Sequence, residues 1–199
     1  MSVDITPASL LHTSTWAGGT TTELRIFPTE SVYQERNFDV RISSARVDLD
    51  QSEFTSLPEY TRYIMPLKGE LELEHEGNVG ARLSPYQVHC FEGAWRTTSK
   101  GKCTDFNLML RHGWEGEMGT LAIGEAREYR VLSLLCVYVL EPSILVVDGE
   151  AFDGQSVKPG DVISICAYEG TRSIALLPEQ EEHVSAPLAV WASAWRSEV

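Results

Sequence analysis

Apolar and polar residues alternate along most of the chain, and this pattern predicts β-strands almost throughout. The clearest case is residues 67–74, where Leu67, Leu71 and Leu73 fall on one face and charged residues on the other. A period of two is that of a strand with one buried and one wet face. Short helices are expected only at residues 7–12 and in the last dozen residues, where apolar side chains cluster without alternation. The other predicted strands are residues 23–27, 38–47, 60–65, 103–110, 131–140, 144–147, 162–167 and 173–177.

Turns that contain glycine or proline separate these strands and suggest a sandwich or barrel. Residues 69–91 run strand, turn, Leu-Ser-Pro, strand, and residues 144–165 run strand, Asp-Gly turn, Val-Lys-Pro-Gly-Asp, strand. A weak internal repeat of this kind favours two stacked jelly-roll barrels. We therefore predict an all-β fold, with a first barrel at residues 1–112 and a second, tightly joined barrel at residues 113–199. Residues 112–130 would connect the two.

The repeated phrase, in which a strand and a turn lead to Pro-x-x-Val/Ile and another strand, resembles the cupin barrel motif. Cupin enzymes typically hold a metal with an H-x-H pair, a carboxylate and a later histidine. This sequence contains no H-x-H, and His75 and His89 are single, so no metal or other cofactor is expected. Their 14-residue separation could bring the two histidines together across a hairpin. Lone histidines at strand ends, however, are more often satisfied surface or core groups.

The strand at residues 103–110 carries an unusual polar face. Asp105, Asn107 and Met109 occupy alternate positions and share one face, with apolar residues between them on the other. Aspartate and asparagine are normally depleted in strands. Their presence side by side therefore predicts one polar wall of a pocket.

Two arginines fall on strands that could face this wall. Alternation places Arg41 and Ser43 opposite their apolar neighbours, and Arg62 begins another apolar strand. A guanidinium binds a carboxylate through two parallel hydrogen bonds. Arg41, Arg62 and Asp105 thus make a credible acid-binding pocket. The competing interpretation is structural, with Arg41 paired to Asp105 or capping a barrel end.

Residues 15–23 combine an aromatic ring, two glycines and several hydroxyls before a strand. Such a loop can close over a small ligand, with Trp16 as the lid and hydroxyls such as that of Thr20 as donors. The alternative is an ordinary turn with a packed tryptophan. No G-K-S/T follows the glycines, so this is not a phosphate-binding loop, and no nucleophile elbow or dinucleotide fingerprint occurs elsewhere.

Composition narrows the functional classes. The chain has 199 residues, 43% of them hydrophobic, which is ample for a packed core. A formal charge of -13 opposes a nucleic-acid or anionic-membrane partner. No secretory signal or membrane-spanning run is evident, which predicts a cytoplasmic protein. The cysteines lie far apart without a C-x-x-C pair, so we expect reduced, mostly buried thiols at Cys90, Cys103, Cys136 and Cys166.

Several phrases together resemble the HutD/Ves family of bacterial bicupins. They are residues 16–28, 38–45, 54–58, Arg62, 67–69, 91–93 and 105–111. The resemblance implies a two-barrel cupin without an established enzymatic activity. Some members are linked to histidine utilisation, with a proposed role in sensing or limiting intermediates such as formylglutamate, and others carry a stress-induced label. By motif match, the resemblance implies pocket residues at Trp16, Thr20, Arg41, Ser43, Arg62, Asp105 and Asn107.

Three functions fit these observations. The leading hypothesis is a non-catalytic bicupin that binds a small carboxylate-bearing metabolite. The second is a metal-independent isomerase or hydrolase for a small organic acid, with Asp105 as general base; it needs a raised Asp105 pKa, whereas a neighbouring arginine would lower that pKa. The third is an interaction module in which Trp191 and Trp195 mark a homodimer interface, although core packing of both rings is the favoured interpretation.

Overall fold

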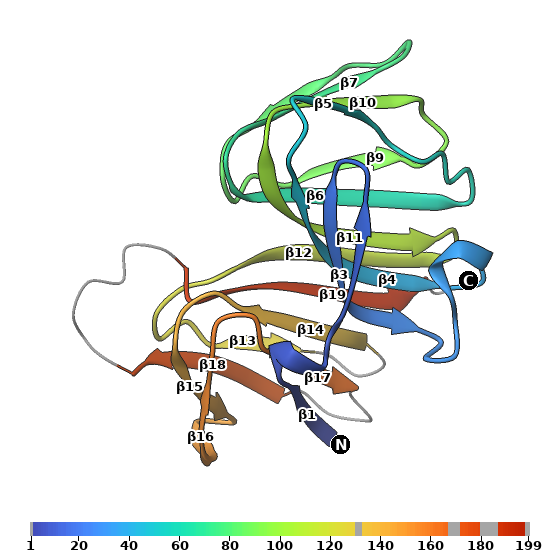
Figure 1. Cartoon of the computed structure of the whole chain (residues 1–199). Helices are drawn as coiled ribbons and strands as arrows, with labels where there is room; N and C mark the ends of the chain where they lie inside the picture. The colour runs from blue at the N-terminus through green and yellow to red at the C-terminus, as the bar shows by residue number, and fades with distance from the viewer. Residues whose placement is uncertain (1, 130–132, 167–171, 180–186, 198–199) are drawn as a thin grey trace. The chain divides into compact units, whose positions relative to one another are not determined.

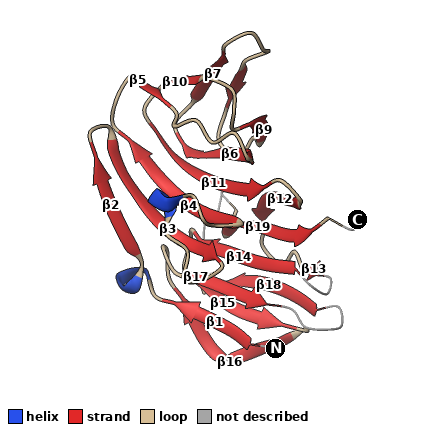
Figure 2. Cartoon of the chain, turned by 90° about the vertical axis from the view of Figure 1, so that its right-hand side faces the viewer, coloured by secondary structure: helices blue, strands red, loops and turns tan. Residues whose placement is uncertain are grey.

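The computed structural model describes residues 2–129, 133–166, 172–179 and 187–197. Within them nearly every element is a β-strand, and the helices are two short 3-10 turns, η1 (Ala8–Leu10) and η2 (Tyr33–Glu35). Figure 1 shows the strands along the chain, and Figure 2 shows how little helix there is. The all-β prediction is therefore confirmed.

The chain divides into two compact units. We call residues 12–115 the N-terminal barrel, and residues 1–11 with 116–199 the C-terminal barrel. The predicted division assigned the first residues to the first barrel. In the structure these residues form β1 (Ser2–Thr6), which pairs with β17 (Val162–Cys166) and so belongs to the other unit. Sequence neighbours are separated here because strand pairing, not chain order, defines the sheet.

The N-terminal barrel consists of two sheets with a hydrophobic core between them. Side chains from both sheets meet in this core, among them Ile64, Leu71 and Phe91. The six-stranded sheet has the order β2 (His12–Trp16), β3 (Gly19–Phe27), β4 (Val40–Val47), β11 (Cys103–Arg111), β6 (Tyr60–Lys68), β9 (His89–Glu92). The four-stranded sheet has the order β5 (Gln51–Glu53), β10 (Thr97–Lys100), β7 (Leu71–His75), β8 (Ala81–Leu83).

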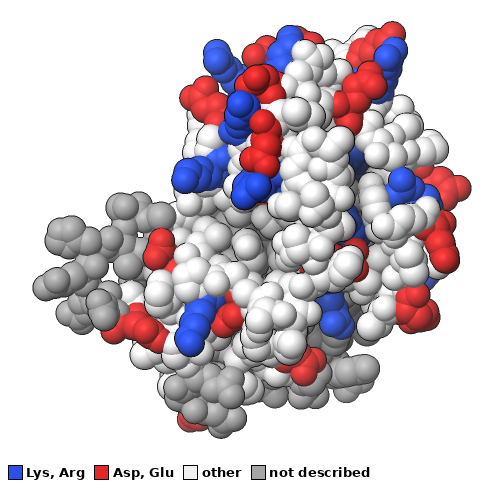
Figure 3. Space-filling model, viewed as in Figure 1, with Lys and Arg blue, Asp and Glu red and all other residues white. Residues whose placement is uncertain are grey.

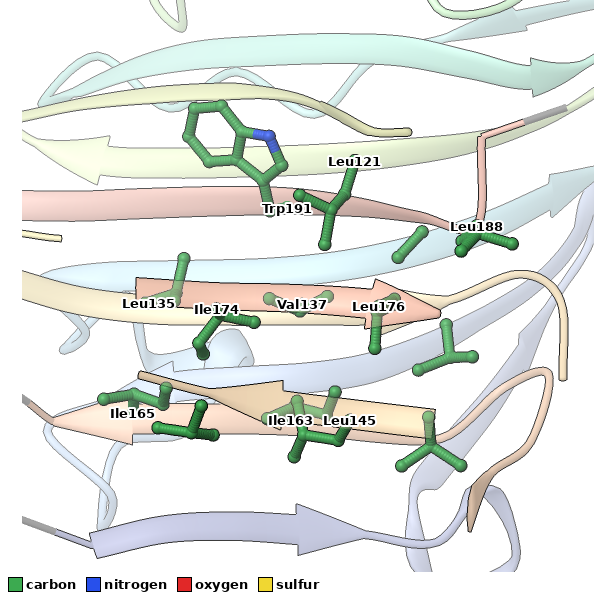
Figure 4. Close-up of a cluster of buried hydrophobic side chains, with 14 residues drawn as sticks. Leu121, Leu135, Val137, Leu145, Ile163, Ile165, Ile174, Leu176, Leu188 and Trp191 are labelled. Carbon is green, nitrogen blue, oxygen red and sulfur yellow. The ribbon is translucent and has the colours of Figure 1, made fainter. Parts of the chain in front are cut away.

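The C-terminal barrel also consists of two sheets, and a cluster of buried aliphatic and aromatic side chains forms its core (Figure 4). Trp191 lies in this core with 3% of its surface exposed, and its Nε1–H donates to the Thr120 carbonyl at 3.0 Å. Core packing, not an interface, therefore accounts for Trp191. The five-stranded sheet has the order β1, β17, β14 (Ser133–Val139), β19 (Ala189–Arg196), β12 (Trp114–Leu121). The four-stranded sheet has the order β13 (Arg127–Tyr129), β18 (Arg172–Pro178), β15 (Ser143–Val147), β16 (Glu150–Val157).

The predicted internal repeat is confirmed by the strand orders. The order β5-β10-β7-β8 of the N-terminal barrel recurs as β13-β18-β15-β16, and β4-β11-β6-β9 recurs as β12-β19-β14-β17. The two barrels are thus copies of one topology, as the similarity of residues 69–91 and 144–165 predicts. In addition to the repeated strands, the hairpin of β2 and β3 extends the six-stranded sheet of the N-terminal barrel, and β1 extends the five-stranded sheet of the C-terminal barrel.

Some predicted elements differ from the structure. The last residues form β19, not a helix, because this strand is buried on both faces and so lacks polar alternation. Residues 112–130 contribute β12 and β13 instead of a bare connection. The break predicted between the strands at residues 60–65 and 67–74 lies later in the chain. Strand β6 continues to Lys68, and Gly69, with a φ of +83°, makes the turn that follows it. The short helix predicted at residues 7–12 is the turn η1.

Charged residues decorate the outer face of the four-stranded sheet in the N-terminal barrel, where Figure 3 shows both signs interspersed. Arg96 pairs with Glu53 at 3.0 Å and Lys100 with Glu74 at 2.5 Å. Glu53, Glu74 and Arg96 line a hollow of about 240 Å³. These surface ion pairs fit the expectation that the charged face of the strand predicted at residues 67–74 is exposed to solvent.

Among the described residues, no helix has the length and apolar character needed to cross a bilayer.

Candidate functional site

The polar residues predicted on separate strands come together on the inner face of the N-terminal barrel. In the register of β4, β11 and β6, Arg41 and Arg62 both lie opposite Met109, while Ser43 lies opposite Asn107. Residues directly paired across strands share a face. The polar side chains therefore share one face of the sheet, and they are buried: Arg41, Ser43, Arg62, Asp105 and Asn107.

Asp105 is held by neighbours on its own strand and on β4. Its Oδ1 accepts hydrogen bonds from Asn107 Nδ2 at 2.5 Å and from the Ala45 backbone N–H at 3.3 Å. The Cys103 thiol lies 3.9 Å from Oδ2. Among the described contacts, the hydrogen-bond partners of this carboxylate are neutral groups.

Burial raises the pKa of Asp105 to about 6, because desolvation outweighs the hydrogen bonds and the attraction of Arg62. Arg62 lowers this pKa, as expected of a neighbouring arginine, but desolvation has the larger effect and the net shift is upward. The same burial, together with the Asp105 charge, raises the pKa of the Cys103 thiol to about 12. Cys103 is therefore an inert thiol.

Arg41 pairs with Glu23 on β3 instead of with Asp105. Its Nε–H donates to Glu23 Oε2 at 2.9 Å, and its Nη1 donates to Ser43 Oγ at 3.3 Å. The guanidinium also lies 4.2 Å from the centre of the Tyr33 ring, and that of Arg36 lies 4.2 Å from the same centre. Both guanidiniums are therefore within the distance of a cation–π contact with Tyr33.

A cavity of about 210 Å³ opens beside Arg41 and Glu23. Of the predicted pocket residues, Arg41 is the one that lines it. Strands β2 and β3 and the segment around η2 supply the rest of the wall, which is rich in hydroxyl groups. The lining residues are His12, Ser14, Thr21, Glu23, Ser31, Val32, Tyr33, Gln34 and Arg41.

Arg62 is bound within the barrel wall. Its Nη1 donates to the Thr55 carbonyl at 3.2 Å, and the guanidinium lies 4.7 Å from the Phe54 ring centre and 5.3 Å from that of Phe91. Burial lowers its pKa to about 10, so it remains charged at neutral pH. Arg62 is therefore a buried positive charge. It lies on β6, on the opposite side of Met109 from Arg41 of β4.

Trp16 and Thr20 lie on the hairpin of β2 and β3, and neither lines the cavity. Trp16 is 39% exposed and lies over Gly18, where a Cβ would stand 2.0 Å from its ring. This arrangement matches an ordinary turn with a packed tryptophan, the alternative to a loop that closes over a ligand. A side chain at residue 18 would therefore require the indole of Trp16 to move.

Two partners of Arg41, Glu23 and Tyr33, are absent from the predicted set. Glu23 belongs to a strand that the sequence did predict, and it lies opposite Ser43, immediately before a register shift between Glu23 and Arg25. Such a bulge has no signature in the local sequence. Tyr33 comes from the loop segment η2, which carries no periodic pattern.

The two single histidines of this barrel do meet. His75 Nε2 and His89 Nε2 are 3.0 Å apart, as their spacing allowed. No set of three potential metal ligands occurs in the described part of the chain, and the H-x-H set of cupin enzymes has no counterpart in the sequence. The residues present therefore do not fit that metal site.

The cysteines only partly match their prediction. Cys103 and Cys136 are buried, as expected. Cys90 is exposed, because in β9 it occupies the position between the inward-facing His89 and Phe91. The side chain of Cys166 lies outside the described residues.

Solved structures with this fold include two Pseudomonas proteins. The conserved protein PA5104 of Pseudomonas aeruginosa PAO1 is 19% identical, with a TM-score of 0.79 and 99% of this chain and 100% of that chain covered. HutD of Pseudomonas fluorescens SBW25 is 17% identical, with a TM-score of 0.75 and the same coverage. The pirin YhhW of Escherichia coli, solved with nickel(II), is 9% identical over 99% of this chain and 100% of that chain, with a TM-score of 0.63.

The TM-scores and the near-complete coverage of these chains establish a shared cupin-type fold. The search of curated proteins finds no match. The family model for HutD matches residues 8–183, which is most of the chain. The chain therefore belongs to the HutD family.

Proposed function

We propose that this protein binds a small carboxylate-bearing metabolite in the cavity beside Arg41, without catalysing a reaction. The observation that carries the proposal is a buried guanidinium in the wall of a polar cavity of about 210 Å³. A buried cation attracts an anion strongly because little water screens it. The cavity volume suits a small metabolite and excludes a large cofactor.

The donors of Arg41 are suited to a carboxylate. The bonds to Glu23 and Ser43 use Nε and one Nη1 proton, and a guanidinium carries further N–H donors. Each contact between charged groups contributes on the order of 1.5 to 3 kcal/mol. Hydroxyls of Ser14 and Thr21 in the same wall supply partners for the remaining polar groups of a ligand.

A second candidate function is a metal-independent isomerase or hydrolase with Asp105 as general base. The pKa of about 6 favours it, since a base is most effective when its pKa lies near the working pH. Against it, Asp105 does not line the cavity, and its Oδ1 already accepts two hydrogen bonds. Binding without turnover therefore remains the preferred function.

The family suggests where the ligand comes from. HutD relatives are linked to histidine utilisation, so the proposed ligand is an acidic intermediate of histidine breakdown such as formylglutamate. A cytoplasmic location belongs to the same proposal. It is supported by the free thiols of Cys90 and Cys103, which persist in a reducing compartment.

Isothermal titration calorimetry with formylglutamate, glutamate and urocanate tests the proposal. We expect one of these acids to bind the wild-type protein, and the Arg41→Gln variant to bind it at least tenfold more weakly. Arg46→Gln is the matched control, because Arg46 lies on the same strand but its side chain is 63% exposed. Absence of binding by all three acids, or equal binding by both variants, would overturn the proposal. Turnover of an acid that Asp105→Asn abolishes would favour the enzyme instead.

A further inference from the structure

Arg111, the last residue of β11, does not line the cavity, yet its guanidinium binds the chain segment that follows one cavity wall. Its Nη2 donates to the Arg36 carbonyl at 2.7 Å, and its Nε–H donates to the Phe38 carbonyl at 3.1 Å. Nη2 also donates to the Tyr60 hydroxyl at 2.9 Å. One side chain thus holds two backbone carbonyls of the loop between η2 and β4.

The Tyr60 hydroxyl completes this arrangement. Its oxygen lies 2.8 Å from the Phe38 carbonyl and 2.9 Å from the Arg36 carbonyl, and Tyr60 is buried. Burial raises the pKa of Tyr60, so the hydroxyl keeps its proton at neutral pH. A hydroxyl donates a single hydrogen bond, whereas a guanidinium donates several. Without Arg111, one of the two carbonyls would therefore lose its side-chain donor.

The loop that Arg111 holds determines where η2 ends. Arg36 closes η2 with a φ of +57°, in the left-handed region, and its own Nη1 donates to the Tyr33 carbonyl at 2.9 Å. An arginine with positive φ is uncommon and needs stabilising contacts from its surroundings. The Arg36 carbonyl is the group that Arg111 binds at 2.7 Å. Arg111 therefore stabilises the backbone conformation that places Tyr33.

A row of aromatic rings also connects Arg111 with the cavity. The ring centres of Tyr33 and Phe38 are 5.9 Å apart, and those of Phe38 and Tyr60 are 4.5 Å apart. The Arg111 guanidinium lies 5.1 Å from the centre of Tyr60, and the Arg41 guanidinium lies 4.2 Å from the centre of Tyr33. Closely packed interiors transmit displacements from one side chain to the next. A shift at Arg111 should therefore reach Arg41 through these rings.

We propose that Arg111 is a positioning residue for the ligand site, which acts on Arg41 through Tyr33. By holding the loop after η2, it keeps the Tyr33 ring against the Arg41 guanidinium and so fixes the direction of the Arg41 donors. This role rests on the function proposed above, in which Arg41 binds the ligand carboxylate. Arg111 already pairs with Glu59 at 2.9 Å and Asp39 at 3.2 Å, so it is not itself the binding group.

Arginine side-chain signals test this role before any ligand is added. In protein labelled with ¹⁵N at arginine, the Nε–H signal of Arg41 reports the position of Tyr33, because an aromatic ring shifts the resonances of nuclei above its face. We expect Tyr33→Leu to move this signal and Arg111→Lys to move it in the same direction. Lysine keeps the charge but lacks the planar fork that binds two carbonyls.

Two further variants make this test robust. Arg82→Gln is the control, since Arg82 lies in the same barrel with its side chain 76% exposed, and the Arg41 signal should stay in place. Tyr60→Phe keeps the buried ring and removes only the hydroxyl. It should move the Arg41 signal in the same direction as Arg111→Lys, and it provides the same readout if that variant does not fold.

Calorimetry with formylglutamate, glutamate and urocanate measures the consequence for binding. For the acid that binds the wild type, we expect Arg111→Lys to weaken binding by about threefold to tenfold. In the Tyr33→Leu background, the same substitution should change the affinity by less than about twofold, because Arg111 acts through the missing ring. Arg82→Gln should bind as the wild type does.

Two results would contradict the role of Arg111. One is an Arg41 signal that stays in place in the folded Arg111→Lys or Tyr60→Phe variant. The other is an equal loss of affinity on Arg111→Lys with and without the Tyr33 ring. If none of the acids binds the wild type, the proposed function fails, whereas a moved Arg41 signal would still support the positioning of Arg41 by Arg111.

Discussion

Arg41 and Glu23 form an ion pair of 2.9 Å in which the arginine side chain is 7% exposed and the glutamate side chain is 26% exposed. The carboxylate of Glu23 thus occupies one edge of the guanidinium that the proposed ligand would bind. Protein and ligand carboxylates then compete for the same cation. This relationship makes Glu23 a determinant of ligand affinity.

We expect Glu23→Gln to bind the acidic ligand about threefold to tenfold more tightly, because a neutral amide competes less for Arg41. The free energy of unfolding should fall by about 1 kcal/mol, since the partly exposed ion pair is screened by solvent. Calorimetry and chemical denaturation measure the two quantities. Weaker ligand binding in Glu23→Gln would mean that Glu23 itself contacts the ligand.

The ring of Tyr33 should affect affinity through Arg41. We expect Tyr33→Leu to weaken acid binding by roughly threefold to thirtyfold, because a cation–π contact of about 0.5 to 2 kcal/mol positions the guanidinium. Tyr33→Phe keeps the ring and should bind almost as the wild type does. Titration calorimetry on both variants separates the role of the ring from that of the hydroxyl.

Asp105 should leave a signature in the pH dependence of stability. Its pKa is raised in the folded state, from 3.8 to about 6, so the folded protein holds the proton more tightly than the unfolded chain. Stability from this group is therefore present below pH 4 and is lost as the pH rises through 6, by about 3 kcal/mol in total.

Denaturation of wild type and Asp105→Asn between pH 4 and 7 measures this effect. The wild type should lose about 2 kcal/mol relative to the variant across that range. Asp50→Asn is the control, because the Asp50 side chain is 92% exposed and should give almost no difference. A wild type that instead gains stability relative to Asp105→Asn as the pH rises would show that the Asp105 pKa is lowered.

Trp16 distinguishes a lid from a packed turn. Since its ring covers Gly18 and does not line the cavity, we expect Trp16→Ala to lower the free energy of unfolding by about 1 to 2 kcal/mol. Its affinity for the acidic ligand should match that of the wild type. A loss of ligand affinity in Trp16→Ala without a loss of stability would instead support the interpretation of Trp16 as a lid.

Alternation alone was enough to predict most of what matters in the fold. It identified the strand of Asp105, its polar face and the repeat that produces two barrels. It failed at β19, where burial on both faces removes the polar positions on which alternation depends. It also missed short edge strands such as β8 (Ala81–Leu83), which are too brief to show a period.

The site was harder to predict than the fold. Sequence spacing placed Arg41, Arg62 and Asp105 on one inner face, but ion pairing depends on register and distance across strands. Arg41 pairs with Glu23 on β3, which lies opposite Ser43, two residues further along β4. Similarly, the raised pKa of Asp105 follows from the degree of burial, which a strand pattern does not quantify.

The repeated strand order has a consequence for the two interiors. Strand β11 and its equivalent β19 hold the same topological position, yet β11 presents Asp105 and Asn107 to its interior while β19 presents Trp191. The interior of one barrel thus holds a buried carboxyl group at this position, whereas the described core cluster of the other consists of aliphatic and aromatic side chains. The shared strand order therefore fixes the path of the backbone in both barrels but leaves the chemistry of equivalent inward-facing positions free to differ.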